Sequence, residues 1–310
     1  MATKKSKTSN KSTKANSTKP KTAAKTVKKP ELEASKTNTV EQKSEKKIFK
    51  GFFARKYEEK ESILTVFKNP KFYGALLGET LGTMFITLLL LSFWPVGIAW
   101  SQGSANIATY AFAVIAIVAS VYAISGACLN PLVTVGMMST RRMSVIRGVM
   151  YIIVEILGAW FAWLIINAFH LAGGESAMDA PAMAAIGEGK FWAIAILELI
   201  GAIIIGFFFV RALSFKRSVF TFATVVTGGI MLAFFVGFIA SAAFMGLQNN
   251  MILNPAIATM LQIFPTAGES FGEILGGICI ALSAYAIFPM LGGVIGFYLA
   301  DFTAKLSGEN

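Results

Sequence analysis

Two Asn-Pro pairs lie in otherwise apolar sequence, and both residue types suit the start of a helix. The segments are Asn130-Pro131-Leu132 and Asn254-Pro255-Ala256. Asn is a favoured N-cap because its side chain accepts a hydrogen bond from a backbone N–H of the first turn. Pro is favoured at the next position because the N–H that it lacks would have no partner there. The pairs therefore predict two short helices, over about 131–139 and 255–263, whose N-termini would each carry partial positive charge.

The chain around these pairs is too apolar for an ordinary soluble domain. Hydrophobic residues make up 55% of its 310 residues, and its mean hydropathy is +0.62. A run of about 20 apolar residues is long enough to cross a bilayer as a helix. We therefore expect an all-α membrane protein in which the two short helices enter the bilayer without crossing it. Six spans are predicted, over about 72–93, 105–125, 145–169, 190–210, 219–243 and 279–300.

Basic residues in the apolar part of the chain gather on alternate connections between the spans. They are Arg141, Arg142 and Arg147 after span two, Arg211, Lys216 and Arg217 after span four, and Lys305 after span six. The connections on the other side hold one basic residue, Lys190, at the edge of a span. Positive residues mark the cytoplasmic side of a membrane protein. We therefore expect a multi-pass protein of the cell membrane with both termini in the cytoplasm.

The N-terminal region has a different composition from the rest. Residues 1–71 hold 20 of the 28 Lys and Arg residues and have almost no apolar side chains before Ile48. Such a segment cannot bury enough surface to offset the entropy lost on ordering. We predict a disordered basic cytoplasmic tail over 1–71, a membrane domain over 72–303 and a short cytoplasmic tail over 304–310. The N-terminal tail is interpreted as a solvated segment, with binding to anionic lipid as the alternative, and no nucleic-acid partner is expected.

The membrane domain repeats its own pattern. Glu79-Thr80-Leu81-Gly82 in span one matches Glu198-Leu199-Ile200-Gly201 in span four, and the two Asn-Pro pairs match each other. Gly158 in span three and Gly292 in span six form a third pair. Each half has three spans, an odd number, so the halves must run in opposite directions. Inverted repeats place the functional site near the bilayer midplane, where broken helices meet, and irregular backbone at that depth must be buried or line a cavity.

At these residues the chain resembles the major intrinsic protein family, the aquaporins and glycerol facilitators, over about residues 70–303. The family motif Ser-Gly-Ala-His-Leu-Asn-Pro-Ala-Val-Thr matches Ser125–Thr134, with Cys128 in place of His and Leu132 in place of Ala. Glu155 stands where the family usually has Gln. The resemblance implies an aquaporin-like fold, with six transmembrane helices and two re-entrant half-helices in an inverted 3+3 repeat. It also implies a homotetramer with one pore per subunit and passive conduction of water or small uncharged solutes such as glycerol.

The resemblance also assigns roles to individual residues. It places Asn130 and Asn254 at the pore midplane, together with the residues that follow them, Pro131, Leu132, Pro255 and Ala256. Glu79 and Glu198 would support the two re-entrant loops from behind. Charged residues at membrane depth are costly and usually functional, so transport or proton relay is the alternative role for these two.

The resemblance also implies an outer selectivity filter of four positions, which ungapped offsets from the two motifs locate in this sequence. They are Tyr110, Ala242, Met251 and Ile257. Ile257 replaces an almost invariant Arg of the family, which supplies fixed donors and a positive charge. The filter is therefore expected to be atypical and apolar. For Glu155 we expect a hydrogen-bonded substitute for Gln, with a pH-sensitive group as the alternative.

Two other readings of the function stay open. Because the Arg is missing, the pore could be non-selective or leak ions, or a plugged pore could leave an interaction or scaffold protein with the same fold. An enzyme is not expected, because the single His ends a span and no metal-ligand spacing, nucleophile motif or phosphate loop occurs. We therefore expect no cofactor and no metal.

Overall fold

A computed structural model describes residues 63–93, 104–173, 186, 189–214, 218–240, 251–262 and 270–308. Of the tail predicted to be disordered over 1–71, residues 1–62 lie outside these residues, as does the predicted filter residue Ala242. From Ile63 the prediction is wrong, because Ile63–Phe67 is helical and the first span begins at Pro70. The described part is helical. Its helices are α2 (Ile63–Phe67), α3 (Pro70–Phe93), α4 (Ser104–Ser125), α5 (Pro131–Ser139), α6 (Val145–Ala172), α7 (Phe191–Ser214), α8 (Val219–Ala240), α9 (Pro255–Gln262), α10 (Phe271–Leu282) and α11 (Phe288–Leu306).

Six helical segments of the described chain are long and apolar enough to cross a membrane. They are α3, α4, α6, α7, α8 and the continuous segment Phe271–Leu306, so the six predicted spans are confirmed. The half-helices α5 and α9, of 9 and 8 residues, are too short to cross. The fold is therefore the predicted all-α architecture of six spans with two re-entrant half-helices.

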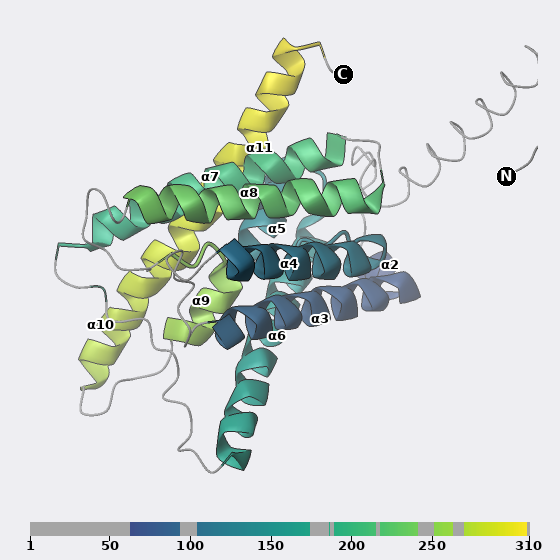
Figure 1. Cartoon of the computed structure of the whole chain (residues 1–310). Coiled ribbons are helices and arrows are strands. Elements are labelled where there is room, and N and C mark those ends of the chain that lie inside the picture. Colours follow the sequence, from purple (N-terminus) through teal and green to yellow (C-terminus); the bar gives the residue numbers. More distant parts are fainter. Residues whose placement is uncertain are drawn as a thin grey trace, which may run out of the picture. The chain divides into compact units, whose positions relative to one another are not determined.

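The sixth span differs from the prediction at its start. It begins at Phe271 rather than near residue 279, and a π-helical turn over Ser283–Ile287 joins α10 to α11. The two helices follow one another along a single path (Figure 1). Ser270 caps α10 in a reciprocal pair with Glu273, whose carboxylate accepts from the Ser270 N–H. This capping box fixes the helix start before the long apolar run, which is why hydropathy alone placed it too late.

The helix packing follows the inverted repeat. In the first half α3 packs on α4 and α6, and in the second α7 packs in the same way on α8 and α11. Each half-helix packs on the last span of the opposite half, α5 on α11 and α9 on α6. The two halves are thus interlocked through their half-helices.

The repeated glycines make matching close contacts in the two halves. A Cβ on Gly158 would meet the carbonyl oxygen of Thr80, and a Cβ on Gly292 would meet that of Leu199. Thr80 and Leu199 each follow the buried Glu of the repeat. In both halves, therefore, the third span can approach the first span closely only because it carries Gly at this position.

Candidate functional site

The N-termini of α5 and α9 meet at a cavity whose wall is mostly apolar. Helices α3, α4, α7 and α8 surround it, and the segments that lead into the half-helices complete it. Tyr110, Cys128, Asn130 and Asn254 supply the polar side-chain atoms among its described lining residues, and no charged side chain is among those residues. The space open to water-sized molecules is about 50 Å³, enough for about three to five waters at roughly 10–15 Å³ each.

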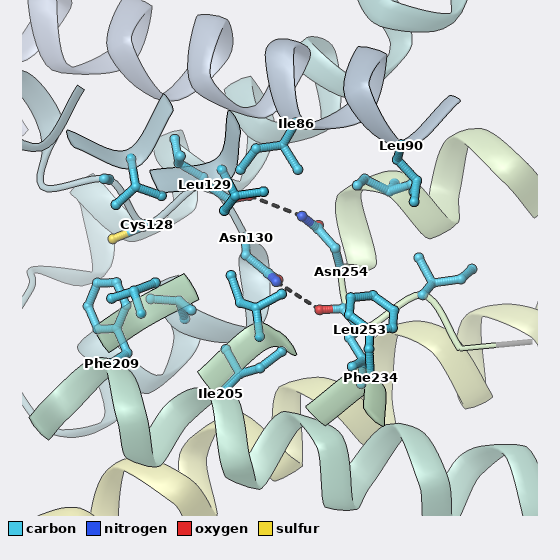
Figure 2. Close-up of a pocket in the computed structure, with 18 of the residues that line it drawn as sticks. Ile86, Leu90, Cys128, Leu129, Asn130, Ile205, Phe209, Phe234, Leu253 and Asn254 are labelled. Atoms are coloured by element: carbon cyan, nitrogen blue, oxygen red, sulfur yellow. Dashed lines mark hydrogen bonds between the residues drawn. The ribbon is translucent and has the colours of Figure 1, made fainter. Parts of the chain in front are cut away.

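Asn130 and Asn254 hold the two half-helices together through crossed hydrogen bonds. The Asn130 Nδ2 donates to the Leu253 carbonyl at 2.8 Å, and the Asn254 Nδ2 donates to the Leu129 carbonyl at 3.1 Å (Figure 2). An Asn amide carries two N–H donors, so each of these bonds leaves the second donor of that amide for the cavity. The predicted midplane pair is therefore brought together, and both side chains line one cavity.

Each Asn is also the N-cap of its own half-helix. The Asn130 Oδ1 accepts from the Leu132 N–H at 3.1 Å, and the Asn254 Oδ1 accepts from the Ala256 N–H at 3.0 Å. The caps fix both side-chain amides, since the oxygen is held by the helix and the nitrogen by the opposite loop. The helix starts at Pro131 and Pro255 agree with the prediction to the residue.

The residues after the two Asn side chains are buried outside the cavity wall. Pro131, Leu132, Pro255 and Ala256 are buried, and none is among the described residues that line the cavity. The Leu132 carbonyl lies against Gly293 of α11. A side chain larger than the Ala of the family motif is thus accommodated at Leu132 by helix packing and does not enter the cavity.

Glu79 and Glu198 hold the two loops from behind by matching hydrogen bonds. Glu79 accepts from the N–H groups of Cys128 at 3.1 Å and of Leu129 at 2.6 Å. Glu198 accepts from the N–H groups of Ile252 at 2.6 Å and of Leu253 at 3.0 Å. Both carboxylates are fully buried. Each one satisfies two N–H groups of a non-helical segment, which would otherwise be unpaired at membrane depth.

The glycine one turn after each Glu makes room for the same loop. A Cβ on Gly82 would meet the Leu129 side chain, and a Cβ on Gly201 would lie 2.6 Å from the Leu253 Cδ2. Leu129 and Leu253 have positive φ, 51° and 53°, a conformation that an L-residue adopts only when its surroundings enforce it. The Glu-x-x-Gly pattern therefore has one purpose in both halves: the Glu binds the loop backbone and the Gly admits the loop side chain.

The predicted outer filter is brought together only in part. Tyr110 and Ile257 line the cavity, and Ile257 is 2% exposed. Met251 is half-buried and lies against Gly201 and Gly237. It is not itself among the described lining residues, although it packs beside some of them. The wall at the position of the family's Arg is thus an aliphatic side chain with no donor.

Sequence reasoning missed a clamp at the other end of α5. Arg142 forms a bidentate ion pair with Asp301 of α11, with Nη1 to Oδ2 at 2.9 Å, and the Tyr298 hydroxyl donates to the Ser139 carbonyl at 2.8 Å. The sequence held one signal for this ion pair: Arg142 and Asp301 have opposite charges and lie on segments predicted to face the same side of the membrane. This clamp holds the C-terminal end of α5, while Glu79 holds the loop before it.

Glu155 ties α6 to α5. Its Oε1 accepts from the Thr134 hydroxyl at 2.7 Å, while its Oε2 is buried and has no hydrogen-bond partner among the described residues. The side chain is fully buried and is not among the described residues of the cavity wall. A Gln could make the same bond with its own oxygen, which supports the interpretation of Glu155 as a structural substitute.

We expect Glu155→Gln to keep solute flux within about twofold of wild type, because the Gln oxygen can still accept the Thr134 hydroxyl bond that positions α5. Thr134→Val should lower the free energy of unfolding by about 1–3 kcal/mol, because it leaves a buried carboxylate without its donor. Flux into proteoliposomes and thermal unfolding in detergent measure the two effects. Loss of flux in a folded Glu155→Gln protein would instead indicate a titrating role for Glu155.

The fold and the cavity define a class: a multi-pass membrane protein in which two broken helices of an inverted repeat meet end to end. The family model described as major intrinsic protein matches residues 66–299. The chain belongs to the major intrinsic protein family, as the sequence motifs indicated.

Individual relatives and one solved structure agree with this assignment. The lens fiber major intrinsic protein of Lithobates pipiens is 33% identical over 97 residues, 30% of this chain and 36% of that protein, so this match spans about a third of that relative. Aquaporin C of Dictyostelium discoideum is 26% identical over 224 residues, 68% of this chain and 78% of that one. The X-ray structure of the aquaglyceroporin from Plasmodium falciparum has a TM-score of 0.60 at 17% identity, covering 77% of this chain and 100% of that chain. At that identity the structural match shows the fold.

Proposed function

We propose that this protein is a passive transmembrane channel for water and small uncharged solutes such as glycerol, with an apolar outer constriction that lacks the usual Arg. The observation that carries the proposal is the pair of crossed amides, Asn130 and Asn254, where two helix N-termini meet a cavity. A solute oxygen passing this point can accept from the remaining donor of each amide. The rest of the wall is mostly apolar and offers few hydrogen-bond partners to the solute.

The two half-helices supply the opposition to cations in this proposal. Each helix N-terminus carries a partial charge of roughly +0.5, concentrated in its first turn. Both ends face the cavity region at Asn130 and Asn254, and their fields add there. Neutral solutes do not meet this barrier, so the geometry favours uncharged cargo.

We further propose a homotetramer in the cell membrane with both termini in the cytoplasm. The three arginines near the C-terminal end of α5, Arg141, Arg142 and Arg147, support that orientation through the positive-inside rule. The basic N-terminal tail would then be cytoplasmic and solvated, with binding to anionic lipid as the alternative.

Stopped-flow swelling of proteoliposomes in water and glycerol gradients tests the channel. Purified protein should raise permeability to at least one of the two above that of empty liposomes, with an activation energy close to that of free diffusion. Absence of flux for any small neutral solute, from a protein that is folded and correctly inserted, would overturn the proposal and favour the scaffold alternative.

An ion-leaky pore is the second candidate, and one observation favours it: no described lining residue carries a charge. Ile257→Arg should return a fixed positive charge to the outer wall and lower any cation conductance by about tenfold, the effect of roughly 1.4 kcal/mol of added barrier. Ile257→Met is the matched control for side-chain size. Planar-bilayer recording measures the conductance, and equal currents from wild type and both variants would exclude a role for charge at this position.

A further inference from the structure

The side chain of Met251 occupies a recess between α7 and α8 that two glycines create. A Cβ on Gly237 of α8 would coincide with the Met251 sulfur and lie 2.6 Å from its Cε. A Cβ on Gly201 of α7 would lie 3.0 Å from the same Cε. Both helices therefore carry a glycine, which has no side chain, where they face the Met251 thioether.

The recess adjoins the cavity. Ile252 and Leu253, the next two residues after Met251, line the cavity, and so does Phe234, which lies about one turn before Gly237 on α8. Glu198 holds the N–H groups of Ile252 and Leu253. The backbone beside Met251 is thus fixed, and only its side chain is free to change direction.

Methionine is suited to such a change. Its side chain is unbranched and has three rotatable bonds, so it adopts a new direction at low cost. A Cβ added at Gly237 would fill the recess from the α8 side, while α7 closes it at Gly201. Met251 also packs against the clusters that contain the lining residues Leu253 and Ile257, so a displaced thioether would move toward the cavity on that side.

We propose that the recess formed by Gly201 and Gly237 keeps the Met251 thioether out of the conduction path, which makes Gly237 a position that determines solute size selectivity. The inference rests on the proposed channel function. Met251 leaves the outer cavity open when its own side chain lies in the recess, and narrows the cavity when a side chain at position 237 takes its place there. Gly237 acts through Met251 and is therefore a positioning residue.

The test is Gly237→Ala, read as the ratio of glycerol to water permeability in proteoliposomes. The expected result is a fall of about fivefold or more in that ratio, because pore diameter limits the larger solute first. Gly228→Ala is the matched control on the same helix, since a Cβ there meets nothing within 4 Å. It should leave the ratio within about twofold of wild type.

The double variant Gly237→Ala with Met251→Ala separates selectivity from general damage. It should restore the ratio to within about twofold of the Met251→Ala value, because no thioether remains to be displaced. A folded Gly237→Ala protein with the wild-type ratio, or a double variant that stays as restricted as Gly237→Ala, overturns the inference.

A second readout does not depend on flux. With ¹³C-methyl methionine, the Met251 resonance, assigned by its loss in Met251→Ala, should shift in Gly237→Ala and stay in place in Gly228→Ala. A wild-type protein that passes no solute refutes the proposed channel, whereas an unshifted Met251 resonance in Gly237→Ala refutes the recess.

Discussion

Replacing either loop-holding carboxylate, Glu79→Gln or Glu198→Gln, is expected to lower solute flux by more than about tenfold and to destabilise the protein. Each carboxylate accepts two backbone N–H groups with its two oxygens. A Gln has a single acceptor oxygen, and its NH₂ would face one of those N–H groups. Losing a hydrogen bond to a charged group costs about 1.5–3 kcal/mol, and the buried N–H left without a partner adds its own penalty.

Glu155→Gln is the matched control for this prediction. All three carboxylates are fully buried, but Glu155 accepts from one hydroxyl donor and can be replaced without losing it. The measurements are flux in proteoliposomes and the thermal unfolding midpoint in detergent. Suppose that Glu198→Gln keeps its unfolding midpoint and its water flux and loses only proton flux across the membrane. The loop-holding role would then be wrong, and Glu198 would act as a proton relay.

Much of this arrangement could be predicted from the sequence, because it depends on residue types with few alternatives. In an Asn-Pro pair both residues favour the start of a helix, and α5 and α9 begin at Pro131 and Pro255. A Glu in an apolar span needs buried donors, and only a re-entrant loop offers unpaired N–H groups there. The odd number of spans per half then required the inverted repeat.

The direction of the loop side chains could not be predicted in the same way. An ungapped offset places Met251 at the constriction, but the direction of its side chain depends on a backbone with positive φ at Leu253, which a Leu gives no reason to expect. It also depends on Gly237 and Gly201, which lie 14 and 50 residues earlier in the chain. A recess formed by residues of two other helices leaves no local signal in the sequence around Met251.

The two halves of the repeat also differ in a way that the matching motifs conceal. The half-helix α5 is held by Glu79 before its start and by the Arg142–Asp301 pair just after its end. At the start of α9, Glu198 makes the bonds equivalent to those of Glu79. Both half-helices also pack on the last span of their own half, α5 on α6 and α9 on α10 and the π-helical turn. Within the described residues the Arg142–Asp301 pair is therefore what distinguishes α5.

Asn254→Asp is expected to turn the meeting point of the two half-helices into a path for cations at high pH. The new carboxylate keeps one oxygen on the Ala256 N–H, and its second oxygen faces the Leu129 carbonyl that the amide nitrogen now contacts at 3.1 Å. Two helix ends of roughly +0.5 each are then offset by one full negative charge. The net charge at this point falls to about zero, so the electrostatic barrier that opposes cations is lost.

The pH dependence of this variant has a definite sign. When the Asp is protonated its hydroxyl can donate to the Leu129 carbonyl and reproduce the lost bond, so neutral-solute flux should return and cation current should fall as pH is lowered. When the Asp ionises, the bond is replaced by repulsion between two oxygens, and cation current should rise with pH. Asn254→Leu, which removes the donor and adds no charge, is the control and should show no such pH dependence. Recording currents at several pH values decides the matter, because a variant as impermeable to cations as wild type at high pH would mean that the two helix ends do not set the barrier.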